Sequence, residues 1–436
     1  MIVKARRIAL AFVLILLSLS FAAELMAQSP HVDVITIKGT INPVLVDYVK
    51  RGIEQAEDNG AQALIIQLDT PGGLDSAMRD IIQYVDSAHV PVVVYVAPSG
   101  ARAASAGLYI LQAAHVAVMA SSTATGAATP IAMGEQGEVE MSDELKAKTL
   151  NDAIAYITGH AETRGRNVEW VERAVREGVS VNEREALDLN VIDMVAPDLE
   201  TLVKMLDGRE VTLLNNQKVM LHTQGITISD VPMKAIEKFL YTLADPNIAY
   251  ILLSVAMLGI TAEIFNPGLI FPGVIGGICL LMAFYSLGML PVNYAGVLFI
   301  VLAFGLFIGE VLTTSFGLFT AGGVVSLIIG SLLLFQGAPA LFRVSPWLIV
   351  VVTAGISGAL AFIISRAIKI HRKQAATGSE ELSGKTALVK VALNPSGTVF
   401  YKGELWSAVS ESGDVRAGEE VLIDRIEGLT LYVKKK

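Results

Sequence analysis

One stretch decides the fold of the N-terminal half of the chain: residues 90–119 read VPVVVYVAPSGARAASAGLYILQAAHVAVM. An apolar, β-branched run at 90–96 is followed by a turn of small residues and then by an apolar helical stretch at 108–114. A second strand-like run, 116–119, comes directly afterwards. This order predicts two parallel strands joined by a crossover that contains a helix.

The same alternation extends towards the N-terminus. Strand-like runs at 34–37 and 63–68 are separated by helical stretches at 42–59 and 74–87. Alternation of this kind predicts a mainly parallel sheet with helices on its faces, and ligands in such folds bind beyond the carboxyl ends of the strands. We place this α/β domain at residues 28–240.

Ser105 lies in the turn after the third predicted strand, within Pro-Ser-Gly-Ala-Arg-Ala-Ala-Ser-Ala-Gly at 98–107. Its hydroxyl is expected near a helix N-terminus, where the dipole and free N–H groups favour developing negative charge. The small side chains around Ser105 also allow another backbone to approach. By itself, however, such a serine is more often a helix cap than a nucleophile.

A second motif, Asp-Thr-Pro-Gly-Gly at 69–73, ends the preceding strand; we call it the Gly-Gly turn. Because carboxyl ends of parallel strands share one edge of the sheet, this turn is expected beside Ser105. Gly72 and Gly73 can point N–H groups at a carbonyl oxygen, as an oxyanion hole requires. An ordinary strand-to-helix turn is an equally good interpretation of the motif alone.

A serine nucleophile needs a base, and the histidines do not provide one. His115 follows Ser105 by ten residues, which is about 15 Å along a helix axis and therefore too far. We interpret His115 and His160 as structural or solvated. A lysine can serve when desolvation leaves it neutral. Two candidates, Lys146 and Lys148, begin a predicted helix, and its apolar periodicity favours Lys146 for the buried face.

Two hydrophobic regions indicate a membrane protein. Basic residues followed by an apolar run and a small-residue site resemble a signal peptide at residues 1–27, with an uncleaved anchor as the alternative.

In the second region, from 246 to 365, the only charged side chains are Glu263, Glu310 and Arg343. At about 20 residues per crossing, region 246–368 predicts five spans, at 248–264, 268–290, 294–310, 318–335 and 347–368. Glu263-Ile264-Phe265 also recurs as Glu310-Val311-Leu312, a weak internal repeat.

Charge predicts the orientation of these spans. Four basic residues lie at or just after the end of the last span, namely Arg366, Lys369, Arg372 and Lys373, whereas the basic residues before the first span are diluted by acidic ones. We therefore expect the C-terminus in the cytoplasm and the α/β domain outside it, which agrees with an odd number of spans.

The C-terminal region, residues 384–436, is joined by a polar linker at 374–383 and contains five short strand-like runs separated by turns. This pattern predicts a small closed barrel. Its acidic residues oppose phosphate binding, so we expect protein docking, with the aromatic side chains mostly in the core: Phe400, Tyr401, Trp406 and Tyr432.

Composition excludes several other classes of protein. A net charge of -9 gives little basic surface for nucleic acid. The single cysteine, Cys279, excludes an intrachain disulfide framework and a cysteine-rich metal site. We expect no metal and no cofactor.

Together these motifs resemble long-form NfeD proteins, which are membrane-bound serine proteases related to signal peptide peptidase A and ClpP. The resemblance also includes Arg-Gly-Arg-Asn-Val-Glu-Trp at 164–170 and Glu-Ala-Leu-Asp-Leu-Asn-Val-Ile-Asp at 185–193. The tail, from Asn-Pro-Ser-Gly at 394–397 to Gly-Leu-Thr-Leu at 428–431, is similar to the NfeD OB-fold. The implied fold is a ClpP/crotonase-like α/β domain, a multi-pass helical membrane region and a small all-β OB-fold barrel.

The resemblance assigns roles to individual residues. Ser105 is the nucleophile, and the candidate oxyanion donors are Gly72, Gly73 and Ala106. The base precedes an Asn-Asp-Ala segment, here 151–153, by three residues, which selects Lys148 and leaves Lys146 as runner-up. One departure is an asparagine at position 190, where related proteases usually have glycine; asparagine tolerates the left-handed conformation.

The resemblance therefore implies a multi-pass serine endopeptidase of the cytoplasmic membrane with a Ser105/Lys148 dyad. It further implies hydrophobic peptide substrates, a stomatin-like (SPFH) membrane partner and a homo-oligomer. The alternative is a non-enzymatic membrane organiser that uses the α/β domain for assembly and the barrel for docking. Acyl-CoA chemistry on the related crotonase scaffold is weaker, because an exported domain has no pool of that substrate.

Overall fold

The computed structural model describes residues 30–130, 133–134, 137–138, 142–265, 268, 270–313, 317–336, 342–371 and 382–436. The predicted signal peptide, 1–27, and all but the last two residues of the predicted linker, 374–383, lie outside the described residues. The chain divides into two compact units, Met1–Ser357 and Gly358–Lys436.

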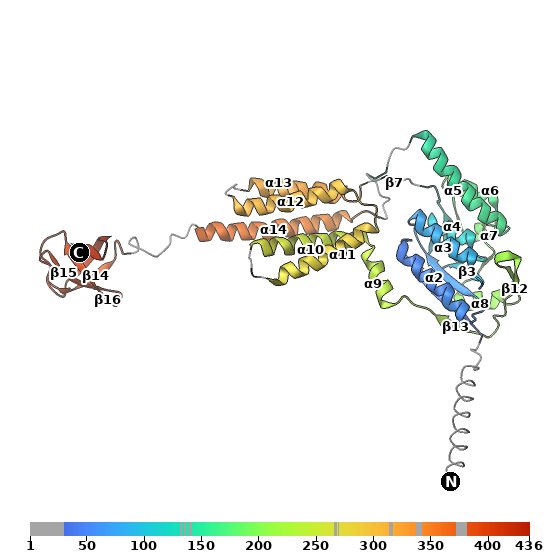
Figure 1. Ribbon diagram of the computed structural model, residues 1–436, viewed down its shortest axis with the longest axis horizontal. Coiled ribbons are helices and arrows are strands. Elements are labelled where there is room, and N and C mark those ends of the chain that lie inside the picture. The colour runs from blue at the N-terminus through green and yellow to red at the C-terminus, as the bar shows by residue number, and fades with distance from the viewer. Residues whose placement is uncertain are drawn as a thin grey trace, which may run out of the picture. The chain divides into compact units, whose positions relative to one another are not determined.

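A six-stranded parallel sheet forms the centre of the α/β domain in the first unit, in the order β10-β5-β3-β2-β1-β13 (Figure 1). Its strands are β1 (His31–Lys38), β2 (Leu64–Asp69), β3 (Val92–Val96), β5 (Val116–Met119), β10 (Met194–Val195) and β13 (Thr227–Asp230). The four strands predicted from the sequence are β1, β2, β3 and β5, and the predicted α/β fold class is confirmed.

Both faces of this sheet are buried, as is usual for parallel sheets. Ile35 and Ile37 of β1 belong to the core shared with three helices that connect successive strands, namely α2 (Pro43–Asp58), α3 (Asp75–Ser87) and α4 (Ala106–Ala113). Val32 and Val34, on the other face, pack in a second core that includes residues of α8 (Leu199–Leu206). The alternation along β1 therefore divides one strand between two cores.

A small second sheet lies beyond the carboxyl end of β2. It consists of β4 (Arg102–Ala104), β6 (Ala124–Gly126) and β9 (Ser180–Asn182), and Ala103 of β4 forms a bridge with Thr70. The remaining elements of the domain are β7 (Met133–Gly134), β8 (Gly137–Glu138), α5 (Asp143–Thr163), α6 (Val168–Arg176), α7 (Glu183–Asp188), β11 (Glu210–Thr212), the 3-10 helix η1 (Leu214–Asn216), β12 (Lys218–Met220) and α9 (Ala235–Leu243).

Five helices lie over the region where five membrane spans were expected: α10 (Pro246–Phe265), α11 (Ile270–Gly288), α12 (Tyr294–Leu312), α13 (Leu318–Leu333) and α14 (Pro346–His371). Among the described residues, three of them, α10, α11 and α12, are long and apolar enough to cross a bilayer. The apolar helix α13 and the apolar part of α14 are shorter.

The first four of these helices form two hairpins, in which α10 packs against α11 and α12 against α13 (Figure 1). A Cβ added to Gly276 would lie 3.0 Å from the Ala256 carbonyl oxygen, so the first pair of helices crosses closely. The same relationship recurs 47 residues later, where a Cβ on Gly323 would lie 3.1 Å from the Ala303 carbonyl oxygen. Small residues permit such close contact between membrane helices. The weak sequence repeat therefore corresponds to a repeated hairpin.

The second unit contains a closed five-stranded barrel in the order β14-β15-β16-β18-β17. Its strands are β14 (Thr386–Val391), β15 (Ser396–Tyr401), β16 (Glu404–Ser410), β17 (Glu420–Glu427) and β18 (Thr430–Lys435). Tyr401 and Trp406 pack against the barrel core, as expected. Phe400 and Tyr432 are exceptions to that expectation. Phe400 faces outward from β15 and is exposed, and Tyr432 is half-buried outside the core, with the Arg425 guanidinium over its ring, 4.3 Å from the centroid.

Candidate active site

Ser105 occupies a strained turn between β4 and α4. Its backbone has φ 53° and ψ −119°, a conformation that is uncommon for a residue other than glycine. The Ser105 N–H donates to the Gly126 carbonyl oxygen at 3.0 Å, which fixes the turn against β6. A sharp, strained strand-to-helix turn is one way in which enzymes expose a nucleophilic hydroxyl. The sequence motif predicted the position of Ser105 but not this backbone strain.

The Gly-Gly turn lies directly against Ser105. A Cβ built on Gly72 would lie 2.8 Å from Ser105 Cβ and 3.2 Å from Ser105 Oγ. Gly72 also has φ 124°, which L side chains rarely adopt. The structure therefore brings the two sequence motifs together at the carboxyl edge of the sheet, and only glycine permits the approach.

The N–H of Gly72 already has an acceptor. It donates to Thr70 Oγ1 at 3.0 Å, and the Thr70 hydroxyl donates to the Gly72 carbonyl oxygen, also at 3.0 Å. Thr70 is fully buried, so water does not compete for this hydroxyl. Of the two glycine N–H groups expected to serve as oxyanion donors, that of Gly72 is therefore occupied.

Gly73 is oriented differently, because the residues on both sides of it bond to Ile41. The Ile41 N–H donates to the Gly72 carbonyl oxygen at 2.9 Å, and the Leu74 N–H donates to the Ile41 carbonyl oxygen at 3.0 Å. Since alternate residues of an extended segment point their polar groups to opposite sides, the Gly73 N–H points away from Ile41. Within the described part of the chain, neither this N–H nor that of Ala106, the first residue of α4, has a hydrogen-bond acceptor.

Both candidate lysines lie at the exposed start of α5, and no hydrogen bond between described residues joins either of them to Ser105. Lys146 and Lys148 are both exposed in the first turns of α5, and their ammonium groups make no hydrogen bond or ion pair with any other described residue. The expectation that Lys146 faces the core is wrong. Burial of α5 begins only at Ala153, because the N-terminal end of the helix extends beyond the body of the domain (Figure 1).

Arg79 ties α5 to the site. Its guanidinium bonds Asp152 of α5 at 2.5 Å and Asp75, two residues after Gly73, at 2.9 Å. It also lies over the Tyr156 ring, 4.4 Å from the centroid. Asp152 is one helical turn beyond Lys148, so this contact sets the distance of the lysine-bearing turn from the Gly-Gly turn. No motif in the sequence indicated the role of Arg79.

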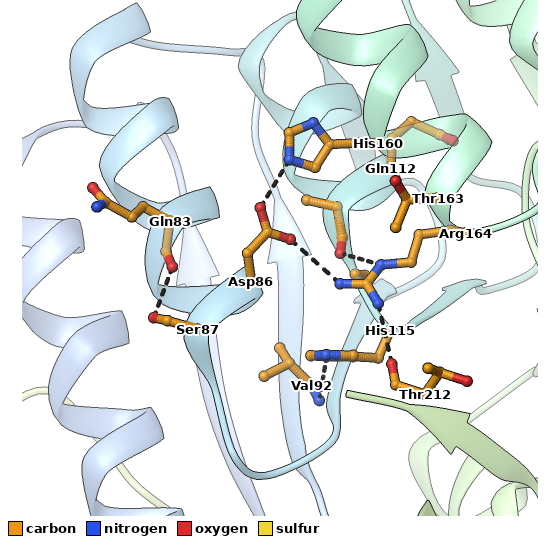
Figure 2. Close-up of polar contacts among 12 residues, drawn as sticks. Gln83, Asp86, Ser87, Val92, Gln112, His115, His160, Thr163, Arg164 and Thr212 are labelled. Carbon is orange, nitrogen blue, oxygen red and sulfur yellow. Dashed lines mark hydrogen bonds and ion pairs between the residues drawn. The ribbon is translucent and has the colours of Figure 1, made fainter. Parts of the chain in front are cut away.

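A second polar cluster surrounds His160 and His115 (Figure 2). The His160 ring bonds Asp86 through Nε2 at 2.9 Å and the Tyr156 carbonyl oxygen through Nδ1 at 2.8 Å. Burial opposes protonation, but these two acceptors outweigh it and raise the pKa of His160. His115 Nδ1 accepts from the Val92 N–H at 3.1 Å. Because Val92 begins β3 whereas Ser105 follows the end of that strand, the cluster lies at the opposite edge of the sheet, which fits the structural interpretation of both histidines.

The described residues contain no group of three or more histidine, cysteine, aspartate or glutamate side chains that could hold a metal ion.

Comparison with protein families gives matches along nearly the whole chain. Residues 31–214 match the NfeD1b N-terminal domain, and residues 247–366 match the NfeD integral membrane domain. Residues 379–435 match the NfeD-like C-terminal, partner-binding domain. The three matches follow the order of α/β domain, membrane helices and barrel.

Two relatives match over their full length. The chain is 36% identical to the membrane-bound protease PH1510 of Pyrococcus horikoshii, over 99% of this chain and 98% of that protein. It is 28% identical to the membrane protein NfeD1b of Bacillus subtilis, over 99% of both chains. Among solved structures, a variant of the 1510-N membrane-bound stomatin-specific protease with a substrate peptide is 34% identical, covers 49% of this chain and 97% of its own, and has a TM-score of 0.46.

The fold, the membrane helices and the full-length relative define a membrane-bound serine endopeptidase. The chain belongs to the NfeD family.

Proposed function

We propose that this protease cleaves peptides at the carboxyl edge of the α/β sheet with Ser105 as the nucleophile. The observation that carries the proposal is the contact between Gly72 and Ser105 in its strained turn. A peptide carbonyl placed over Ser105 Oγ meets the N–H groups of Gly73 and Ala106, which stabilise the oxyanion that forms on attack. In this assignment Gly72 contributes close approach, and its own N–H remains bonded to Thr70.

Lys148 is the proposed base, with Lys146 as the runner-up. Lys148 lies one turn, about 6 Å along the helix axis, from Asp152, which Arg79 holds beside the Gly-Gly turn. Its exposure means that the long side chain is free to swing, and a bound peptide would exclude water from it. A lysine accepts a proton only when it is neutral, so cleavage is expected to rise with pH.

The test is cleavage of a hydrophobic peptide by the full chain in detergent. Ser105→Ala should abolish cleavage without unfolding the protein, because it removes the attacking oxygen and little volume. Lys148→Ala and Lys146→Ala separate the two candidate bases, since only the true base is essential. Full activity of Ser105→Ala would exclude this assignment.

The 1510-N protease of Pyrococcus horikoshii is specific for a stomatin homologue, which supports a similar role here. We propose that the chain acts on hydrophobic segments of a stomatin-like (SPFH) membrane protein and that the barrel binds this partner. The match of residues 379–435 to a partner-binding domain supports the second part. Cleavage of a stomatin-like protein expressed with the full chain, but not with Ser105→Ala, is the expected result.

We further propose that the protein lies in the cytoplasmic membrane with five spans within residues 246–368. Five apolar helices and the basic residues that follow the last of them support this topology. It places the α/β domain (28–240) outside the cytoplasm and the barrel (384–436), beyond the linker at 374–383, inside. Labelling single cysteines introduced on each domain with a membrane-impermeant reagent in intact cells tests this orientation.

One observation favours the alternative of a membrane organiser without enzymatic activity, namely that both candidate lysines are exposed and that, within the described residues, neither is hydrogen-bonded to Ser105. An organiser would bind its partner equally well in the wild type and in Ser105→Ala, and neither protein would cleave a peptide. Peptide cleavage that depends on Ser105 excludes it.

A further inference from the structure

The outer face of the barrel carries three apolar side chains in line, Leu388, Phe400 and Leu405, which we call the apolar row. Leu388 of β14 lies directly opposite Phe400 of β15, and Phe400 lies directly opposite Leu405 of β16. Their exposed fractions are 36%, 38% and 67%. The row therefore crosses three neighbouring strands on the surface.

The apolar row plays no part in the barrel core. Each of its members alternates along its strand with an inward residue, and Val389 and Val399 are the inward pair next to Leu388 and Phe400. Neither packing nor strand pairing requires a large apolar side chain at the outward positions. Aligned exposed apolar residues on a small soluble barrel instead mark a surface that another molecule covers.

The surroundings of the row resemble the rim of a protein interface. The next outward pair on β15 and β16 is Thr398 and Ser407, two hydroxyl residues. On β14, the ammonium group of Lys390 lies over the Phe400 ring, 5.5 Å from its centroid. The residue opposite Thr398 on β14 is Val391, an exposed apolar side chain at the rim of the row, and the residue opposite Leu388 on β17 is Glu420. An apolar centre with polar and charged neighbours is typical of protein–protein contact.

The closed topology restricts how a partner can bind. In the barrel each strand pairs with two neighbours, so the apolar row does not lie on a free edge where a partner strand could be added. A partner must therefore pack its side chains against the row. Facing side chains on adjacent strands are about 5 Å apart, which matches the spacing of about 5–6 Å between residues i and i+4 of a helix.

A lipid surface fits this face less well than a protein. The basic run at the C-terminus could attract anionic lipid, but the barrel neutralises it. Lys434 pairs with Asp424 at 2.9 Å and Lys436 with Glu420 at 2.6 Å. Lys435 lies 3.4 Å from Glu419. What remains beside the row is Lys390 together with the ion pair of Lys436 and Glu420, which lies opposite Leu388.

We propose that the apolar row is the surface with which the barrel holds its partner, and that its occupant is the apolar stripe of an amphipathic helix in the stomatin-like protein. An acidic residue beside that stripe would face Lys390. This inference rests on the proposed function, in which the barrel binds such a partner.

The experiment measures the fraction of a stomatin-like (SPFH) protein that co-purifies with the full chain from detergent-solubilised membranes. Phe400→Ser and Leu405→Ser should each reduce capture about tenfold or more, the scale of an interface hot spot. Val391→Ser is the control at the rim, because Val391 is 58% exposed but lies opposite Thr398, beyond the bulge of β14, rather than in the row, and rim residues contribute little to binding energy. It should leave capture unchanged. Peptide cleavage by each variant verifies that the rest of the chain is intact.

A chain that lacks residues 382–436 distinguishes two claims, namely that the barrel binds the partner and that it does so through the apolar row. If this deletion loses the partner but the row variants keep it, the barrel binds through another face and the inference is overturned. If the deletion also keeps the partner, the proposed function of the barrel itself fails. If Phe400→Ser and Leu405→Ser reduce capture in lipid vesicles but not in detergent, the occupant of the row is lipid and the inference is likewise overturned.

Discussion

The backbone N–H of Gly72 donates a hydrogen bond at 3.0 Å to the side-chain hydroxyl of Thr70, a residue that is fully buried. The same hydroxyl donates to the Gly72 carbonyl oxygen, so one side chain holds both polar groups of one glycine. Because Gly72 touches Ser105, the Thr70 hydroxyl fixes the peptide that carries the Gly73 N–H beside the nucleophile. Thr70 is thus a positioning residue for the proposed oxyanion hole.

Thr70→Val removes this hydroxyl while keeping the shape of the side chain. The buried N–H of Gly72 then loses its acceptor, which costs about 1–3 kcal/mol and lets the turn rotate. We expect kcat for peptide cleavage to fall about tenfold to a hundredfold with little change in KM, less than the loss of an oxyanion donor itself, because Thr70 only positions that donor. Thr70→Ser retains the hydroxyl and should restore most of the activity. Equal kcat in Thr70→Val and the wild type would remove Thr70 from the site.

Gly72→Ala tests the contact with Ser105. The new Cβ would lie 2.8 Å from Ser105 Cβ at a backbone φ of 124°, so it is both strained and crowded. Gly100→Ala is a matched control, because Gly100 has φ 87° but nothing within 4 Å of an added Cβ. Both variants bear backbone strain of about 1–2 kcal/mol. Thermal unfolding should show a loss of stability in both, whereas peptide cleavage should disappear only in Gly72→Ala.

Much of this site could be predicted from the sequence, because it depends on the order of strands. Parallel strands end at one edge, so two motifs that each follow a strand, at Gly72 and at Ser105, were expected to meet. The orientation of individual N–H groups could not be predicted. It depends on hydrogen-bond partners. Ile41 is distant in the chain, and the hydroxyl of Thr70 meets the N–H of Gly72 only once the turn between them has folded.

Sequence periodicity gave a wrong prediction in two situations. In one, a helix extends beyond the core, and in the other, a strand carries apolar residues on both of its faces. The pattern of α5 placed Lys146 on the apolar face correctly, but the core ends before the helix does, so that face is solvated at Lys146. For Phe400, strand alternation allowed either side, because apolar residues precede and follow it. Only the pairing of β15 with β14 and β16 decides that Val399 faces inward and Phe400 outward.

The bond between Arg79 and Asp152 predicts a long-range effect on catalysis. Arg79→Met keeps the stem over Tyr156 but releases Asp152, so the first turns of α5 lose a fixed distance from the Gly-Gly turn. We expect a several-fold decrease in kcat and a stability change of at most about 1 kcal/mol, since the pair is partly exposed. Arg173→Met, which breaks an ion pair with Glu177 at the C-terminal cap of α6, is the control and should leave kcat unchanged. If both variants cleave at the wild-type rate, the bond between Arg79 and Asp152 does not position the lysine base.

Acid should destabilise the α/β domain through His115. Burial, assisted by the nearby Arg164 guanidinium, lowers the pKa of His115 to about 3 in the folded chain, against about 6.5 in an unfolded one. Between these values the unfolded state binds a proton that the folded state does not, so stability is complete above about pH 6.5 and decreases as the pH falls towards 3. The expected slope for this one group is about 1.4 kcal/mol per pH unit. Its imidazole must stay neutral to accept the Val92 N–H at Nδ1.

His115→Gln should reduce that slope, because glutamine offers Val92 an oxygen and does not titrate. The measurement is the urea midpoint of the full chain in detergent at a series of pH values between 4 and 7, followed by a signal from the α/β domain. His160→Gln is the informative counterpart, since the pKa of His160 is raised in the folded chain whereas that of His115 is lowered. The contribution of His160 is present below about pH 6.5 and is lost as the pH rises through its folded pKa. His160→Gln should therefore lower the stability of the domain by a constant amount below about pH 6.5 and leave the slope of stability against pH unchanged in that range. A His115→Gln chain whose stability falls with acid as steeply as that of the wild type would show that other groups control the transition.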